Sequence, residues 1–244
     1  MKTLKTLLLS ATLGLALAFS SCVPFFNSNK YLERDGDYNG IVVFCYDDHR
    51  LTSKEIEKNK NELINTHYDS NNLPIFSQQE WWSKKAEEYG AKFNLSLDFY
   101  PNEIKLTKEF ILDGGINLYN FPSYLRKTYP EINNYEFLAI IYEKHGFSGG
   151  KSLSSTKSFY IYSSFIVSEK IEQPFIGDNF AHEFAHLGGA TDKYNPDDST
   201  NNPDKFDLMR NGSFNQETIG MRNGALTEQV KISEQTAREL GWIE

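Results

Sequence analysis

The chain has 244 residues, of which 39% are hydrophobic and 24% are charged. This composition is typical of a globular protein, excludes a disordered or fibrous chain, and favours one domain of moderate size. The formal net charge is -8 at pH 7, whereas binding to the phosphate backbone of nucleic acid relies on clustered lysine and arginine. We therefore expect no nucleic-acid partner.

The N-terminus is typical of an exported protein. Residues 1–21 contain Lys2 and Lys5, then an apolar run, then small residues, which is the order of regions in a signal peptide. The apolar run is too short to span a bilayer comfortably. Residues 19–22, FSSC, resemble a bacterial lipoprotein box, which implies a lipid on Cys22 that anchors the mature chain to a membrane of the cell envelope. An ordinary cleaved signal peptide, followed by secretion, is the alternative.

The only other cysteine, Cys45, lies in the apolar run GIVVFC, where we expect it to behave as a small buried hydrophobic residue. A disulfide between Cys22 and Cys45 is the competing possibility in an oxidising compartment. Two cysteines cannot build a thiolate-rich metal site. Any metal must therefore be held by histidine and carboxylate groups.

Residues 22–39 are polar and predict a tether, so the folded domain is expected over residues 40–244. Hydrophobic periodicity and boundary residues predict the elements of this domain. In chain order they are a buried strand at 41–46, helices at 53–68 and 77–90, a half-buried strand at 92–100, a short helix interrupted by Pro122, a central strand at 136–146, a loop at 147–156, an edge strand at 157–167, a helix beginning near Asp178, a loop rich in Asn and Asp at 193–207 and a final helix at 233–243.

The helix predicted at 77–90 has clear boundary signals. Ser77 can cap its N-terminus together with Glu80 three positions later, and Gly90 can end it. Trp81 and Trp82 then belong to an apolar stripe at helical spacing, which usually faces the interior. We expect the two tryptophans to be core residues and not an aromatic ligand site.

The segment HEFAHLGGATDKY, residues 182–194, predicts a metal site. Four residues advance about 400° around a helix, so His182 and His186 project from one face, one turn apart, and their imidazoles can reach one ion. Glu183 lies about 100° further round, where it need not bind the metal and can address a water molecule. Gly188 and Gly189 can end the helix, because glycine tolerates positive backbone φ angles.

Two histidines leave a tetrahedral ion short of protein ligands. A reversal of the chain at the glycine pair can bring Asp192, six residues after His186, back toward the ion. A carboxylate oxygen is an acceptable third ligand for zinc, and a fourth position then stays open for water. A zinc ion that is only structural is less favoured, because structural sites are usually closed by four Cys or His ligands.

These residues match the extended motif HExxHxxGxxD, with His182, Glu183, His186, Gly189 and Asp192 in its fixed positions. The motif resembles that of the metzincin zinc peptidases, particularly the snapalysin-like and immune-inhibitor-A-like enzymes with aspartate as third ligand. Such enzymes also have a methionine turn beneath the metal, and FDLMRNGS offers Met209 at a suitable distance. The resemblance implies an α+β, zincin-like fold with a mixed twisted sheet, an active-site helix, a methionine turn and a C-terminal helix.

Two positions differ from the pattern of these enzymes. Ala190-Thr191 stands where the aspartate subgroup commonly has Leu-Pro, and Asn211 stands where many metzincins have a tyrosine. Both differences bear on substrate and rate, and neither changes the ligand set.

The expected function is that of an exported zinc-dependent endopeptidase that cleaves peptide or protein substrates. Zinc would lower the pKa of its bound water, and Glu183 would act as general base. An extended substrate would pair with the predicted edge strand around Phe159 to Tyr162. The alternatives are a non-catalytic, zinc-containing surface binding protein of the same fold and a hydrolase of cell-envelope peptides.

Other polar residues give weaker signals. Asp197, Asp198 and Asp204 could bind Ca²⁺ through oxygen ligands, but they lack the spacing of a known calcium loop, and a solvated acidic loop is favoured. His145 follows a predicted strand and could approach the cleft, although a solvated turn residue is the simpler interpretation.

Overall fold

The computed structural model describes residues 35–47, 50–69, 71–112, 115–116, 120–143, 149–163, 176–193, 207–210 and 225–244. The predictions for the signal peptide at 1–21, for lipidation of Cys22 and for His145, the acidic loop and Asn211 lie outside these residues. Within the described part of the chain, no helix is long and apolar enough to cross a membrane.

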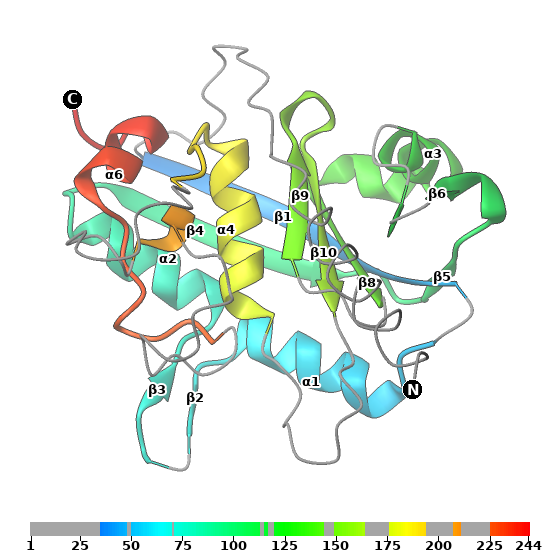
Figure 1. Cartoon of the computed structure of the whole chain (residues 1–244), viewed down its shortest axis with the longest axis horizontal. Helices are drawn as coiled ribbons and strands as arrows, with labels where there is room; N and C mark the ends of the chain where they lie inside the picture. Colours follow the sequence, from blue (N-terminus) through cyan, green and yellow to red (C-terminus); the bar gives the residue numbers. More distant parts are fainter. Residues whose placement is uncertain are drawn as a thin grey trace, which may run out of the picture.

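The described chain contains both helices and strands (Figure 1). The strands are β1 (Asp35–Tyr46), β2 (His67–Tyr68), β3 (Pro74–Ile75), β4 (Lys92–Phe99), β5 (Ile104–Lys105), β6 (Ile111–Leu112), β7 (Gly115–Ile116), β8 (Phe137–Glu143), β9 (Gly149–Leu153) and β10 (Ser158–Ser163). The α-helices are α1 (Ser53–Ile64), α2 (Gln78–Glu87), α3 (Phe121–Thr128), α4 (Gly177–Leu187) and α6 (Glu234–Leu240), and short 3-10 helices include η4 (Leu208–Arg210).

One mixed sheet organises the fold, in the order β4-β1-β8-β10-β9, with β5 also paired to β1. All its neighbouring strands run parallel except β9, which runs antiparallel to β10. The expected α+β class with a mixed sheet is confirmed, and β8 is the central strand that the sequence predicted.

Both faces of the sheet are buried. Alternate residues of a strand point to opposite faces, so those of β1 enter two different cores. In β1, Val42 and Phe44 belong to a core that includes residues of α1, α2, α4 and α6. Val43 and Cys45 belong to a second core that includes residues of α3. Cys45 is a free thiol in this second core, as its apolar surroundings predicted, and burial raises its pKa.

Aromatic rings fill the core between the sheet and α4. The Trp82 ring lies 5.3 Å from that of Phe184 and 5.4 Å from that of Phe93, measured between ring centroids. Trp81 and Trp82 are fully buried, so their prediction as core residues is confirmed. Because Phe184 lies on α4 one position after Glu183, this packing fixes the helix that carries the metal-binding motif.

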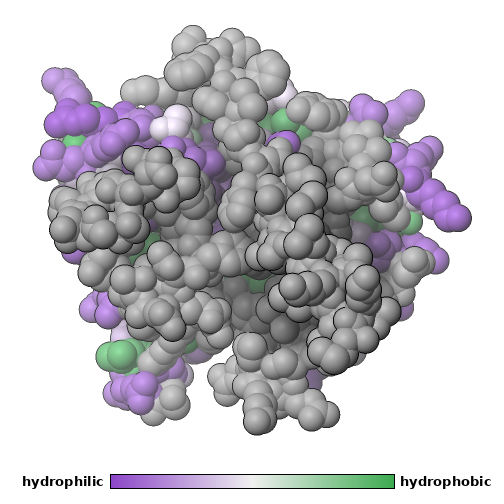
Figure 2. Space-filling view, viewed as in Figure 1, coloured by the Kyte–Doolittle hydropathy of each residue, from purple (hydrophilic) through white to green (hydrophobic). Residues whose placement is uncertain are grey.

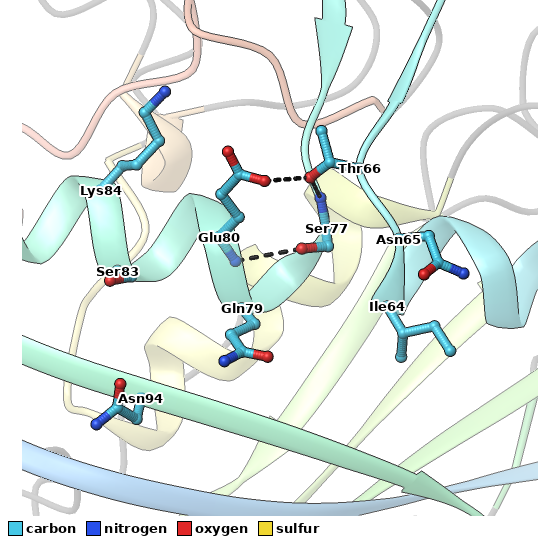
Figure 3. A pocket seen from close by; sticks show the side chains of 9 residues that line it. All are labelled: Ile64, Asn65, Thr66, Ser77, Gln79, Glu80, Ser83, Lys84 and Asn94. Carbon is cyan, nitrogen blue, oxygen red and sulfur yellow. Dashed lines mark hydrogen bonds between the residues drawn. The ribbon is translucent and has the colours of Figure 1, made fainter.

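The predicted start of α2 is confirmed. Ser77 Oγ accepts a hydrogen bond from the Glu80 backbone N–H at 3.2 Å, as Figure 3 shows. The Glu80 side chain does not complete a capping box; it accepts a hydrogen bond from the Thr66 hydroxyl at 2.6 Å. Gly90 follows the helix with φ of 68°, a left-handed conformation that favours glycine.

Two predicted boundaries differ from the structure. β1 begins at Asp35, within the stretch predicted as a tether, because residues 35–42 pair with β4 and Tyr38 stacks on Phe93. The helix predicted at 53–68 ends at Ile64, since His67 and Tyr68 pair with β3 in a hairpin. Pro122 lies in the first turn of α3 and therefore begins this helix rather than interrupting it.

The strand predicted at 157–167 is confirmed at Ser158–Ser163 as β10, but its predicted position at the edge of the sheet is wrong, and so is the prediction of a loop at residues 149–153. Residues 149–153 form β9, which covers β10 on the side away from β8. Backbone hydrogen bonds make this strand, and its sequence, GGKSL, lacks the apolar alternation by which strands are recognised. The strand at the edge of the sheet is therefore β9, and β10 lies inside.

The described surface has little exposed apolar area. The described residues visible around the rim of Figure 2 are mostly hydrophilic. Among the described residues, the large hydrophobic side chains that are exposed are Ile64, Tyr68 and Leu73, at the end of α1 and in the β2–β3 hairpin.

Candidate metal centre

Helix α4, yellow in Figure 1, crosses the sheet. Its two histidines are one turn apart and therefore lie on one face of the helix. The imidazole rings of His182 and His186 lie with their centroids 4.8 Å apart. Asp178, near which the sequence predicted that this helix begins, is a buried residue of its first turn. Glu62 of α1 caps the helix, because its Oε1 accepts hydrogen bonds from the backbone N–H groups of Ile176 and Gly177, at 2.5 and 2.7 Å.

The chain reverses directly after α4. Gly188 has φ of -78°, which any residue adopts, whereas Gly189 has φ of 92° and requires glycine. The reversal brings Asp192 back to the histidines. Its Oδ1 lies 3.0 Å from His182 Nε2 and 3.3 Å from His186 Nε2.

The three side chains predicted as a ligand set therefore lie together. Their ligand atoms all lie within 4.8 Å of one another. In the described part of the chain, these three residues form a group that could hold a metal ion. Imidazole and carboxylate groups bind zinc and other divalent transition metals.

Hydrogen bonds orient both imidazoles for metal binding. His182 Nδ1 donates to the Leu208 carbonyl at 2.9 Å, and His186 Nδ1 donates to the Ala190 carbonyl at 2.8 Å. A carbonyl can only accept, so each Nδ1 carries a proton, and Nε2 is the nitrogen of each ring that is left to bind a metal ion at the cluster.

The cluster fits a bound metal ion. Among the described residues, the buried atoms His186 Nε2 and Asp192 Oδ1 have no hydrogen-bond partner. Buried polar atoms without partners are rare, and they call for an ion or another ligand. A metal ion held by His182, His186 and Asp192 would satisfy both atoms.

The charges of the cluster favour a cation. Burial by itself would lower the pKa of His186, but the close carboxylates of Asp192 and Glu183 raise it to about 9. Burial opposes ionisation of Asp192 as well, yet the two imidazoles hold its pKa well below the ordinary range. The carboxylates thus create a negative potential that attracts either protons or a metal ion.

Glu183 is buried, with 3% of its surface exposed. Its side chain extends from α4 toward β9. The Ser152 hydroxyl donates to Glu183 Oε2 at 2.9 Å and also approaches the Glu183 carbonyl. Burial raises the pKa of Glu183, and the nearby His186 and His182 oppose this shift. Gly150 leaves the space for this carboxylate, since a Cβ at that position would lie 2.3 Å from Glu183 Cγ.

Met209 lies in η4, against α4. Its side chain is fully buried, and its carbonyl accepts a hydrogen bond from the Lys193 backbone N–H at 3.0 Å. The preceding residue, Leu208, provides the carbonyl that orients His182. The segment predicted as a methionine turn therefore supports both His182 and Lys193, the residue after Asp192.

Sequence reasoning missed Gly150, Ser152 and Glu62. The first two lie in the segment interpreted as a loop, and Glu62 lies in a helix whose apolar spacing gave only a weak register. Residues 149–153 pair with 158–162 across a short polar turn, but GGKSL lacks the apolar alternation that would have marked it as a hairpin strand. Nothing local in the sequence connects Glu62 with a helix 114 residues later.

The cavity shown in Figure 3, about 420 Å³, is separate from this cluster. It is lined by residues of α2, by residues 64–66 and by Asn94, and it includes none of the three ligands.

No protein-family model matches the chain, and no curated protein matches it either. The assignment of a function therefore rests on the geometry of the His182, His186 and Asp192 cluster.

Proposed function

We propose that this protein is an exported, zinc-dependent endopeptidase of the metzincin type. The observation that carries the proposal is the convergence of three ligand atoms beside the buried carboxylate of Glu183. His182, His186 and Asp192 would hold the ion. When bound, zinc supplies Lewis acidity, which polarises a carbonyl and makes a water molecule acidic near neutral pH.

Glu183 is the group suited to proton transfer. It follows His182 directly but is not among the clustered ligand atoms, so its carboxylate is left to act as a base. Its raised pKa, caused by burial, favours both taking a proton from water and giving it to the leaving amine. The Ser152 hydroxyl holds Glu183 Oε2 in place.

An extended peptide would bind along β9. Among the described residues, β9 has a partner strand on one side only, where it pairs with β10. A free strand edge offers backbone N–H and C=O groups to an added strand, and this edge adjoins α4. Pairing with β9 replaces our expectation of pairing with Phe159 to Tyr162, which lie inside the sheet.

The proposed location is the cell envelope, through a lipid on Cys22, with secretion as the alternative. The signal-like residues 1–21 and the FSSC box support this part of the proposal. We propose no nucleic-acid partner, because a chain with net charge -8 is poorly suited to binding a phosphate backbone.

The test compares wild type with Glu183→Ala. Purified wild-type protein is expected to contain about one zinc ion and to cleave an unstructured protein such as casein. Glu183→Ala should retain the metal and lose at least about 100-fold in cleavage rate, because only the proton-transfer group is removed. The measurements are metal content and the appearance of new peptide termini.

Three results would redirect the proposal. Cleavage that survives Glu183→Ala would contradict the role of this residue. Normal metal content without turnover on any peptide would favour a non-catalytic zinc-containing binding protein. Cleavage of cell-wall peptides but not of casein would favour an envelope peptide hydrolase.

A further inference from the structure

The loop that carries Asp192 is held at the residue before it by the C-terminal helix. Glu239 of α6 accepts two hydrogen bonds from Thr191: Oε2 from the backbone N–H at 3.0 Å and Oε1 from the hydroxyl at 3.0 Å. In Figure 1, α6 (red) lies beside the end of α4 (yellow). A proline at position 191 would have no N–H for the first of these bonds.

The residue after Asp192 is held as well. Lys193 Nζ lies 3.6 Å from Glu239 Oε2 and 3.3 Å from Asp207 Oδ2, and the ammonium also contacts the Thr236 hydroxyl. The Lys193 backbone N–H donates to the Met209 carbonyl. One lysine thus joins the ligand loop to both η4 and α6.

Asp207 anchors this network in the protein interior. It is 1% exposed, and its carboxylate accepts hydrogen bonds from the Met209 N–H at 3.0 Å and from the Thr236 hydroxyl at 2.8 Å. Burying a carboxylate is costly unless hydrogen-bond donors and a neighbouring cation, here Lys193, compensate for the lost water. Asp207 is therefore the buried anchor of the network through which Thr191 and Lys193 hold the loop.

Asp192 itself lacks a comparable support. Among the described residues, its Oδ1 has no hydrogen-bond partner, although it is buried and lies within 3.3 Å of both imidazoles. A ligand on a loop must be ordered before it binds, and this ordering reduces affinity unless neighbouring residues provide it in advance. Thr191 and Lys193 flank Asp192 on both sides and supply that order.

We propose that Glu239 is a positioning residue of the metal centre, which fixes Asp192 through Thr191 and Lys193 and so sets the affinity for zinc. The C-terminal helix then contributes to metal binding although none of its residues is a ligand. This inference rests on the metal centre of the proposed function and is independent of peptidase activity.

The experiment measures zinc affinity of the full chain by competition with a chelator of known affinity. Glu239→Gln removes the negative charge that faces Lys193 and replaces one of the two acceptor oxygens that face Thr191 by an N–H₂ group, which cannot accept a hydrogen bond. We expect an affinity about 10- to 100-fold weaker than that of wild type, the range typical when a residue that orients a ligand is removed. Circular dichroism before zinc addition verifies that the variant is folded.

The matched control is Glu234→Gln, the same chemical change on the same helix. The Glu234 side chain is 79% exposed, and its ion pair with Arg238 is long, at 3.9 Å. Its zinc affinity is expected to stay within about twofold of wild type, because exposed ion pairs contribute little. Should Glu239→Gln fail to fold, Thr191→Val removes one of the two bonds while the backbone N–H is retained.

A double-mutant cycle separates positioning from a general structural effect. If Glu239 acts through Asp192, the effect of Glu239→Gln should disappear in an Asp192→Ala background. An equal effect in both backgrounds would overturn the inference, as would wild-type affinity in a folded Glu239→Gln protein. A wild-type protein that binds no zinc would overturn both this inference and the proposed function, whereas zinc binding without peptidase activity would overturn the function alone.

Discussion

Glu183 occupies a space that the absence of one side chain keeps open. A Cβ at Gly150 would lie 2.3 Å from Glu183 Cγ and 2.5 Å from the backbone carbonyl of Tyr160. Neither distance is tolerable, so a residue larger than glycine must displace the carboxylate, the strand or both. The position of the proposed base therefore depends on a residue of β9 as much as on α4.

This dependence predicts the effect of Gly150→Ala. The variant should be less stable by about 1 to 3 kcal/mol, the typical cost of adding a methyl group to a packed site. Peptide cleavage should fall by about 100-fold, because a displacement of about 1 Å misaligns a catalytic group. Zinc content should not change, since the atoms nearest to a Cβ at position 150 belong to Glu183 and Tyr160 and not to His182, His186 or Asp192.

The measurements are chemical denaturation, metal content and cleavage rate. Lys92→Ala is the control and should behave like wild type, because Lys92 is exposed on β4, at the opposite edge of the sheet. Full activity in Gly150→Ala would show that Glu183 is not held where we describe it.

The ligand residues were predictable because their relation is local. His182 and His186 are one helical turn apart, and Gly189 permits the reversal that returns Asp192 after six residues. Ser152 was not predictable, because its contact with Glu183 joins residues 31 positions apart through a strand that lacks apolar alternation. Local periodicity carries no information about such a contact.

At the scale of elements, α4 depends on α1 for its N-terminal cap. Glu62 Oε1 binds the N–H groups of Ile176 and Gly177, and Gln78 Nε2 donates to the Gly177 carbonyl at 2.7 Å. Burial raises the pKa of Glu62 to about 8, although the two backbone bonds and Lys58 oppose the shift and Asp178 adds to it. A cap from another helix ties the metal-binding helix to the tertiary fold.

The raised pKa of Glu62 predicts how stability depends on pH. Its folded-state pKa, about 8, is above the ordinary value of 4.5, so the folded protein holds this proton more tightly than the unfolded chain does. The contribution of Glu62 to stability is then complete below about pH 4.5 and is lost as the pH rises through about 8. We expect Glu62→Gln, which cannot ionise, to be less sensitive to alkaline pH than wild type.

Denaturation with urea at a series of pH values from 5 to 9 measures this effect. Glu57→Gln is the matched control on the same helix, because the Glu57 side chain is 63% exposed and pairs only with Lys60 at the surface. The pH profile of the control should follow wild type. Identical profiles for wild type and Glu62→Gln would refute a raised pKa at Glu62.

Element boundaries were predictable where capping residues mark them. Ser77 and Gly90 delimit α2 as expected, because a cap and a left-handed glycine act within one turn. The identity of the edge strand was not predictable. It depends on which strand pairs with β10 on its free side, and GGKSL pairs there through its backbone without an apolar pattern.

At the scale of the whole molecule, the candidate metal centre lies where several elements of one core meet. α4 contributes both histidines, η4 contributes the Leu208 carbonyl, α6 holds the ligand loop through Glu239, and β9 borders Glu183. The α+β class was predictable from the mixture of helical and alternating patterns. The order of the strands was not, since it is decided by packing between segments far apart in the chain.

The central claim is that His182, His186 and Asp192 bind one metal ion, and X-ray absorption at the zinc edge tests it most directly when combined with metal content. We predict about one zinc per chain, two imidazole ligands at about 2.0 to 2.1 Å, further oxygen ligands and no sulfur. His186→Ala should lose most of the bound metal. A protein without metal, a site with sulfur ligands, or zinc content unchanged by His186→Ala would contradict the account.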